Sequence, residues 1–268
     1  MRQAPPSVVA TSELLPQVVR IAHEAGAAIM DIYSAMPATG HQIIRKEDGS
    51  PLTQADLAAH QVIARALARL TPDIPVVSEE DSASQAHRQP RGRFWLVDPL
   101  DGTKEFLARN GEFTVNIALV QDGVAVLGVV VAPALGLAYW GAADLGAFRQ
   151  SRRGTEAIRV ASGQERSGCP LRVLASKSHM NAETQDFLRR LGPHELIQSG
   201  SSLKFCRLAE GSADLYPRLG STCEWDTAAG QAVLEAAGGR VSQLDGAPLR
   251  YGKPDVVNPH FIATTVPQ

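Results

Sequence analysis

Apolar residues recur at helical spacing in two segments near the N-terminus. In residues 12–33 and 53–70 they fall three or four positions apart, as one buried face of an amphipathic helix requires. Ser12 and Thr53 are the predicted N-caps, and Asp56 stands at the capping-box distance from Thr53. The pattern therefore predicts two helices before the first long strand.

The strongest strand pattern lies in the middle of the chain. Residues 113–120 and 124–131 are rich in Val, Ile and Leu, and Asp122-Gly123 separates them as a type I′ hairpin turn would. Shorter apolar runs predict further strands at 74–78, 94–97, 139–140 and 146–148. Together these segments predict a largely antiparallel sheet.

The polar and basic segment 149–169 separates two halves of different character. We place a domain boundary within it, between an N-terminal α+β part (1–155) and a C-terminal α/β part (156–268) that completes a shared site. In the second half, predicted strands at 171–175, 194–198, 213–216, 239–244 and 260–265 alternate with predicted helices at 181–191, 202–210 and 227–237. This alternation predicts a smaller sheet with some parallel pairing, and the expected fold is a layered α-β-α-β-α sandwich.

Composition narrows the class of protein. Of 268 residues, 44% are hydrophobic and 20% are charged, and the net charge of −2 gives no reason to expect a nucleic-acid polymer as partner. No run of 18 apolar residues and no signal-peptide core occurs. We therefore expect no transmembrane segment and a cytoplasmic location, with peripheral association at the inner membrane left open. The scattered Cys169, Cys206 and Cys223 favour a reducing compartment and are expected to be buried apolar groups.

Six carboxylates stand at the end of an apolar strand or in the first turn of a helix: Asp56, Glu79, Glu80, Asp98, Asp101 and Asp226. Each alone has an ordinary explanation as a helix cap or a solvated loop residue. Such positions tend to meet in a cleft of a layered α/β protein, and converging carboxylates repel one another unless cations lie between them. The set therefore predicts a site for hard divalent cations, with Mg²⁺ as the expected ion.

The segment DPLDGT at residues 98–103 adds local geometry. Asp98 and Asp101 flank the Leu100 carbonyl as a third oxygen, and Gly102 lets the backbone approach an anion closely. A helix beginning at Thr103 would direct backbone amides at a phosphate. Haloacid-dehalogenase phosphatases instead carry two aspartates only two positions apart, so the spacing here favours metal-activated water over a phospho-aspartate intermediate.

Three motifs in order resemble the inositol monophosphatase superfamily of magnesium-dependent, lithium-sensitive phosphatases: SEE at 78–80, DPLDGT at 98–103 and WDTAAG at 225–230. The resemblance covers roughly residues 12–265. Within that superfamily the segments 46–56, 98–106 and 200–218 look most like the bacterial 3′(2′),5′-bisphosphate nucleotidases. Those enzymes hydrolyse adenosine 3′,5′-bisphosphate, a by-product of sulfate assimilation, to AMP and phosphate.

The resemblance implies a role for each matching position. The implied metal ligands for two or three Mg²⁺ are Glu79, Asp98, the Leu100 carbonyl, Asp101 and Asp226. Asp56 and Thr103 look like the pair that orients or deprotonates the attacking water, and Glu80 looks like a ligand or supporting group for a weaker metal. Gly102 and Thr103 look like the phosphate cradle, with Asp101 and Asp226 also beside the substrate.

A bisphosphate needs positive charge for its second phosphate, and Lys204 and Arg218 fit that need. Lys104, Ser201 and His179 are further candidates by resemblance. Lys204 could equally lie on a solvated helix face, and His179 could be the neighbour of a helix cap.

Two rival functions stay open at this point. One is the same chemistry on inositol 1-phosphate or another sugar phosphate, and Lys104, Lys204 and Arg218 weigh against it. The other is a non-catalytic nucleotide or metal sensor on the same fold. The expected partner is a small phosphate ester, and the chain is expected to be a monomer or a homodimer.

Overall fold

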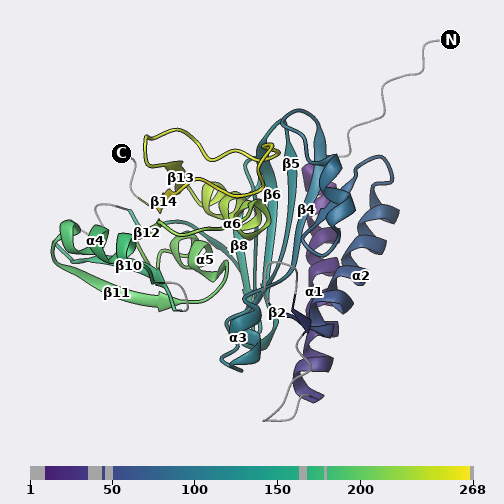
Figure 1. The fold of residues 1–268 in the computed structure, drawn as a ribbon, viewed down its shortest axis with the longest axis horizontal. Helices are drawn as coiled ribbons and strands as arrows, with labels where there is room; N and C mark the ends of the chain where they lie inside the picture. The colour runs from purple at the N-terminus through teal and green to yellow at the C-terminus, as the bar shows by residue number, and fades with distance from the viewer. Residues whose placement is uncertain (1–9, 36–43, 46–50, 163–167, 178–179, 266–268) are drawn as a thin grey trace.

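Helices and sheets alternate in five layers (Figure 1). The computed structural model describes residues 10–35, 44–45, 51–162, 168–177 and 180–265. The helices are α1 (Thr11–Ala35), α2 (Gln54–Leu70), α3 (Thr103–Leu107), α4 (Ala182–Leu191), α5 (Leu203–Ala209) and α6 (Glu224–Ala236), with 3₁₀ turns η1 (Ser82–His87) and η2 (Pro133–Leu135). Helices α1 and α2 cover one face of the larger sheet, α5 and α6 lie between the two sheets, and α4 packs outside the smaller sheet. This arrangement confirms the predicted α-β-α-β-α sandwich.

The larger sheet has seven strands in the order β3-β4-β5-β6-β7-β8-β9. Their bounds are β3 (Val76–Ser78), β4 (Arg93–Asp101), β5 (Thr114–Gln121), β6 (Val124–Ala132), β7 (Leu137–Ala142), β8 (Gly146–Ser151) and β9 (Gly154–Ile158). Only β3 and β4 pair in parallel, and the other neighbours are antiparallel. The predicted hairpin is confirmed, since Asp122 and Gly123 have φ of 50° and 77° as a type I′ turn requires. A separate pair, β1 (Ile44–Arg45) and β2 (Pro51–Leu52), is antiparallel.

The smaller sheet has five strands in the order β11-β10-β12-β14-β13. Their bounds are β10 (Leu171–Ser176), β11 (His194–Ser199), β12 (Leu215–Arg218), β13 (Arg240–Gln243) and β14 (Phe261–Thr264). Strand β10 runs parallel to both β11 and β12, while β14 is antiparallel to β12 and β13. The expected partly parallel sheet is therefore confirmed.

Two local expectations were wrong. Ser12 is not the N-cap of the first helix, because α1 begins at Thr11 and the Ala10 carbonyl accepts the first backbone hydrogen bonds, from Glu13 and Leu14. No strand was predicted within the polar segment 149–169, yet its first part contributes the end of β8 and all of β9. Strand β9 is an edge strand whose residues are mostly exposed, so it has no apolar pattern from which a strand could be predicted. Strand β9 runs across the division proposed at residue 155, which itself stays a prediction.

The core lies on both faces of the larger sheet. Alternate residues of β5 divide between them: Val115 and Ile117 join the cluster under α1 and α2, while Ala118 joins the cluster around α5 and α6. On the latter side α6 lies directly against β6, since a Cβ at Gly128 would come within 2.2 Å of the Ala229 carbonyl oxygen. This close packing fixes where the N-terminal end of α6 meets the sheet.

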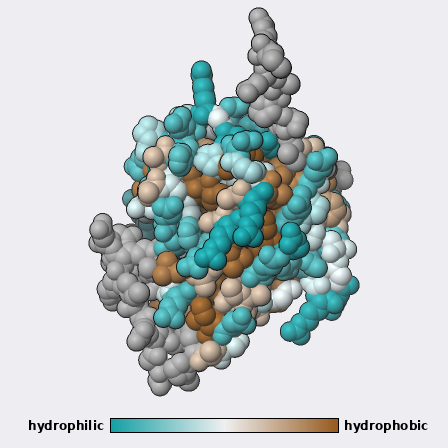
Figure 2. Space-filling view, turned by 90° about the vertical axis from the view of Figure 1, so that its right-hand side faces the viewer, coloured by the Kyte–Doolittle hydropathy of each residue, from teal (hydrophilic) through white to brown (hydrophobic). Residues whose placement is uncertain are grey.

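The outer layer of α1 and α2 is amphipathic. Their inward residues are buried and their outward residues exposed, in the spacing predicted for them. Figure 2 views the molecule from this side and shows rows of hydrophilic side chains with smaller apolar areas between them. Among the residues that the structure describes, no helix combines the length and the apolar character needed to cross a bilayer.

Candidate active site

The two aspartates of the DPLDGT segment lie within strand β4 and not after it. The strand was predicted to end at residue 97, but it continues to Asp101. Asp98 pairs with Asn116 and Asp101 with Thr114, so three steps along β4 correspond to two along β5. Residues three apart on a regular strand face opposite sides, and this one-residue bulge restores the phase. As a result both aspartates line the same cavity.

The chain turns sharply after Asp101 and then begins a helix. Gly102 has φ of 92°, a left-handed conformation that favours glycine, and a Cβ there would lie 3.2 Å from the Glu105 carboxylate. Helix α3 starts at Thr103, where a helix start was anticipated. Leu100, Gly102 and Thr103 all line the cavity.

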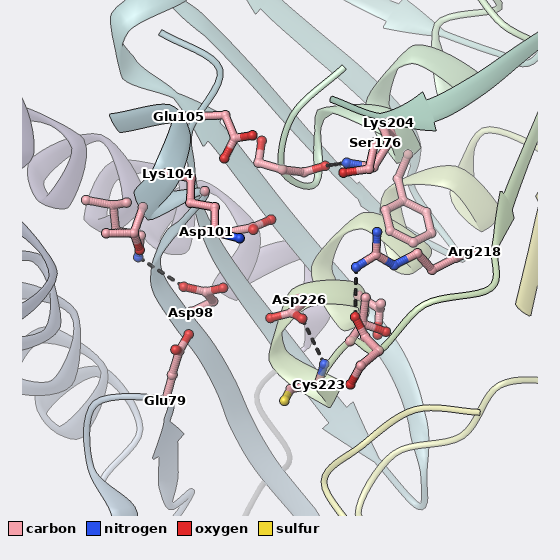
Figure 3. Close-up of a pocket in the computed structure, with 18 of the residues that line it drawn as sticks. Glu79, Asp98, Asp101, Lys104, Glu105, Ser176, Lys204, Arg218, Cys223 and Asp226 are labelled. Carbon is pink, nitrogen blue, oxygen red and sulfur yellow. Dashed lines mark hydrogen bonds between the residues drawn. The ribbon is translucent and has the colours of Figure 1, made fainter. Parts of the chain in front are cut away.

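Three carboxylates converge at the centre of this cavity. One ligand oxygen from each of Glu79, Asp98 and Asp226 lies within 4.8 Å of the other two. Figure 3 shows these three side chains, from β4, α6 and the turn after β3, pointing toward one another, with Asp101 beside them. The cavity has a volume of about 430 Å³. The structure thus brings together residues that lie up to 147 positions apart in the sequence.

Local hydrogen bonds hold these carboxylates in place. Asp226 is the third residue of α6, and its Oδ2 accepts from the backbone N–H of Cys223 at 2.8 Å, as in a capping box. Asp98 Oδ1 accepts from the backbone N–H of Leu100 at 3.1 Å. The backbone N–H of Glu79 donates to the Val97 carbonyl at 3.1 Å, which joins the end of β3 to β4. The carboxylates of Asp226 and Asp98 are therefore oriented by their own segments of backbone, while Glu79 is positioned through its backbone N–H.

The cluster is electrostatically unfavourable without a counterion. Burial raises the pKa of Asp226 well above its usual range, and the charges of Asp101 and Glu79 raise it further. Burial also raises the pKa of Asp101, although Lys204 and two hydrogen bonds act in the opposite direction. Closely placed carboxylate oxygens are the donor set that hard divalent cations such as Mg²⁺ prefer. The residues present therefore fit a divalent cation, which would relieve their repulsion.

Asp56 and Glu80 are placed differently from the other acidic residues. Asp56 is buried in the first turn of α2, where its Oδ2 accepts from the Thr53 backbone N–H at 2.8 Å and from Thr53 Oγ1 at 2.5 Å. This confirms the predicted capping box. The backbone N–H of Glu80 donates to Ser78 Oγ at 3.4 Å, and its side chain is partly exposed. Neither residue is among the described residues that line the cavity, so their roles stay predictions.

A basic wall faces the carboxylates across the cavity. Lys204, Arg218, Ser201 and the exposed Lys104 all line it. The alternative that Lys204 lies on a solvated helix face is excluded, because the residue is only 5% exposed. Helix α5 is buried around most of its circumference, and Lys204 is buried together with its apolar neighbours. His179 lies outside the described residues.

Hydrogen bonds to backbone carbonyls orient the side chains of Lys204 and Arg218. Lys204 Nζ donates to the carbonyls of Ser201 at 2.6 Å and Ser199 at 3.3 Å, and it lies 5.4 Å from the ring centroid of Tyr216. Burial lowers the pKa of Lys204 to about 8, with the charge of Arg218 adding to the effect and that of Asp101 opposing it. Arg218 Nη2 donates to the Ser221 carbonyl at 2.7 Å. Figure 3 shows its guanidinium reaching toward the carboxylates.

Several lining residues were not singled out from the sequence. They include Glu105, Ser176, Tyr216 and Thr222. Cys223 also lines the cavity and is only partly buried, and Cys169 is exposed, so the expectation of buried apolar cysteines is confirmed only for Cys206. Two more polar residues, Asn116 and Ser202, lie directly behind Asp101 and are each 1% exposed. An asparagine within the apolar run FTVNIALV was the available signal for the first of these.

Comparison with known proteins agrees with this fold. The model of the inositol monophosphatase family matches residues 10–266. The chain therefore belongs to the inositol monophosphatase family.

Several similar proteins within that family have a more specific name than the family itself. The 3′(2′),5′-bisphosphate nucleotidase CysQ of Escherichia coli O157:H7 is 49% identical over 249 residues, which is 92% of this chain and 98% of that protein. CysQ of Haemophilus influenzae is 34% identical, over 93% of this chain and 91% of that protein. The crystal structure of CysQ from Bacteroides thetaiotaomicron has a TM-score of 0.84 and 39% identity, over 97% of this chain and all of that one. An inositol monophosphatase from Anabaena has a TM-score of 0.72 and 25% identity, over 95% of this chain and 91% of that one.

Proposed function

We propose that this chain is a 3′(2′),5′-bisphosphate nucleotidase that hydrolyses adenosine 3′,5′-bisphosphate to AMP and phosphate. It is a phosphoric monoester hydrolase of the inositol monophosphatase family, and the relatives that match nearly its whole length carry the nucleotidase name. The observation that carries the proposal is the pairing of a carboxylate cluster with a buried basic wall in one cavity. The carboxylate cluster could bind a cation that in turn binds the scissile phosphate. The basic wall could bind the second phosphate of the substrate.

The proposed metal ligands are Glu79, Asp98, the Leu100 carbonyl, Asp101 and Asp226. All of them line the cavity, and all offer hard oxygen donors. We take Mg²⁺ as the physiological ion, two or three per site. When bound, it would neutralise phosphate charge and lower the pKa of a water molecule. Both effects would accelerate phosphate-monoester hydrolysis, which is very slow without a catalyst.

The remaining residues would bind and orient the ester. Backbone amides near Gly102 and Thr103 are proposed to hold the scissile phosphate, because the left-handed turn at Gly102 keeps a side chain out of the way. Asp56 and Thr103 are proposed to orient the attacking water and accept its proton, with Glu79 nearby and Glu80 supporting a weaker metal position. Asp101 and Asp226, which also line the cavity, are proposed to contact the substrate as well.

The second phosphate is proposed to bind at Lys204 and Arg218. The Lys204 ammonium has three donors, and within the described residues two of them reach carbonyl oxygens, so one remains for an anion. The guanidinium of Arg218 can donate two parallel hydrogen bonds to phosphate oxygens. Lys104 and Ser201 lie on the same cavity wall, and His179 is included by resemblance.

The proposal is tested by a phosphate-release panel with Mg²⁺. The substrates are adenosine 3′,5′-bisphosphate, inositol 1-phosphate and fructose 1,6-bisphosphate, each with and without lithium and with chelator as the blank. We expect the highest kcat/KM on the nucleotide bisphosphate and inhibition by lithium. Preference for inositol 1-phosphate would instead support the sugar-phosphate alternative, and no release from any substrate would support a non-catalytic sensor. A cytoplasmic location and a monomeric or homodimeric state remain predictions.

A further inference from the structure

The hydroxyl of Ser202 stands where the two halves of the carboxylate cluster meet. Its Oγ lies 2.8 Å from Asp101 Oδ2 and 2.7 Å from the backbone oxygen of Asp226. It also lies 2.8 Å from the side-chain nitrogen of Asn116. Ser202 precedes α5, Asn116 lies on β5, Asp101 ends β4 and Asp226 begins α6. One buried hydroxyl therefore joins four elements.

Asn116 supports this junction from the sheet. Its side chain falls on the face of β5 that packs against α5 and α6, and its Nδ2 is also 3.4 Å from Asp101 Oδ2. Both neighbours of that nitrogen are oxygens that can accept, so the amide donates to Ser202 and Asp101. Burying this amide at 1% exposure is costly unless it is hydrogen-bonded. Its Nδ2 has two acceptors, whereas its Oδ1 has no hydrogen-bond partner among the described residues.

These contacts bear on the direction of one carboxylate. Asp101 Oδ2 accepts from both Ser202 and Asn116, which fixes the plane of the carboxylate and hence the direction of its other oxygen. The hydroxyl of Ser202 has a single proton, which Asp101 Oδ2 and the Asp226 carbonyl oxygen share, so it contacts the end of β4 and the first turn of α6 at the same time. The distance between Asp101 and Asp226 is thus set by a side chain that itself offers no ligand to the cluster.

We propose that Ser202 and Asn116 are positioning residues for the reaction, which hold Asp101 and Asp226 in cation-binding geometry before any cation arrives. The proposal rests on the proposed metal-binding function of Asp101 and Asp226. Hydrogen-bond partners of metal ligands typically contribute 10–100-fold to metal affinity or activity. We therefore expect Ser202→Ala and Asn116→Leu each to raise the Kd for Mg²⁺ by about 10–100-fold.

The test is a Mg²⁺ titration of the substrate-free protein, read as the rise in unfolding temperature with ion concentration. Thr114→Val is the matched control, because Thr114 lies on the same strand and face, is fully buried, and its hydroxyl has no hydrogen-bond partner among the described residues. We expect the control to keep the wild-type Kd. A second readout is kcat for phosphate release as Mg²⁺ is raised. Positioning predicts recovery toward the wild-type kcat at saturating Mg²⁺, whereas a general loss of structure would not be rescued.

The double variant adds an independent check. Both side chains act on the same oxygen of Asp101, so Ser202→Ala with Asn116→Leu should raise the Kd by much less than the product of the single effects. If Ser202→Ala does not fold, Asn116→Leu and its control carry the same test.

Failure of the inference and failure of the proposed function give different results. Wild-type Mg²⁺ binding with unchanged Kd in both variants would overturn the positioning role alone. Fully additive effects, or a loss of kcat that excess Mg²⁺ does not restore, would also overturn it. A wild-type protein that shows no Mg²⁺ binding would overturn the proposed function and this inference together.

Discussion

Glu224 is a carboxylate with no exposed surface, two residues before Asp226 at the start of α6. Its Oε2 accepts from the Gly252 backbone N–H at 2.9 Å, and its Oε1 accepts from the backbone N–H of Lys253 at 3.0 Å and from Lys253 Nζ at 2.5 Å. The side chain of Arg88, itself 6% exposed, lies 3.5 Å away. Glu224 thus holds the loop after Leu249 and the segment after η1 against the helix that carries Asp226.

Glu224→Gln keeps the shape of the side chain but replaces one acceptor oxygen by a donor. Whichever way the amide turns, at least one backbone N–H, of Gly252 or Lys253, faces another donor. A buried group left without its partner costs about 1–3 kcal/mol, and removing one partner of a buried ion pair costs about 3–5 kcal/mol in all. The expected loss of unfolding free energy is about 3–5 kcal/mol. At about 2–4 °C per kcal/mol for a domain somewhat smaller than this one, the unfolding temperature should fall by roughly 10 °C.

The assay is urea unfolding of the metal-free protein followed by circular dichroism, with wild type alongside. Lys253→Met is the matched control, because Arg88 and the backbone N–H groups of Gly252 and Lys253 still contact the Glu224 carboxylate, so a smaller loss than that of Glu224→Gln is expected. The reasoning is refuted if Glu224→Gln destabilises the protein by no more than Lys253→Met does.

Three further predictions follow from the cavity and the packing around it. Lys204→Met and Arg218→Ala should each raise KM for the nucleotide bisphosphate about tenfold or more but change KM for a monophosphate little, because charge-assisted hydrogen bonds contribute about 1.5–3 kcal/mol; equal effects on both substrates would contradict the second-phosphate role. Since burial lowers the pKa of Lys204 to about 8, the ammonium is charged at pH 7 and loses its proton as the pH rises through that value. KM for the bisphosphate should therefore rise above about pH 8 in wild type, and a pH profile of Lys204→Met should lack that limb. Gly128→Ala should lower the unfolding free energy by about 3 kcal/mol in a urea titration, because its Cβ would lie 2.2 Å from the Ala229 carbonyl oxygen; an unchanged midpoint would show that α6 can move.

The DPLDGT segment shows how far sequence reasoning reaches. Its residue types and its place after an apolar run were enough to predict a cation site, because carboxylates at such positions converge in layered folds. The bulge that turns Asp98 and Asp101 to the same side could not be predicted, because it depends on the pairing of β4 with β5. The regular strand period would have placed the two aspartates on opposite faces.

Lys204 shows a different limit. The helical pattern of residues 202–210 was correct, but a pattern of one helix does not say which neighbours bury it. In the structure α5 lies between two sheets and packs against α6, so even its lysine is buried. The contacts of Ser202 with Asp101 and Asn116 join residues 101 and 86 positions apart, and no local signal couples them.

The helices and strands of the second half of the chain were predicted more completely than the structure of the segment 149–169 that precedes it. Each predicted strand and helix there is present, because their apolar runs are short and separated by glycine and polar turns. Strand β9 was missed because exposed edge strands carry no apolar alternation. The spacing of apolar residues in a sequence predicts the helices and strands that pack into a core, but it does not reveal a strand whose side chains are exposed on both faces.

The most direct test of the central claim is the kcat for phosphate release from adenosine 3′,5′-bisphosphate by Asp98→Asn, with saturating Mg²⁺ and wild type beside it. Asp98 is 2% exposed and belongs to the converging carboxylates, so its charge serves the proposed cation site. We predict a loss of more than about 100-fold, beyond what losing a supporting hydrogen bond to a ligand causes, with an unfolding temperature at or above that of the metal-free wild type. Turnover at the wild-type kcat would contradict the assignment of this carboxylate cluster as the catalytic metal site.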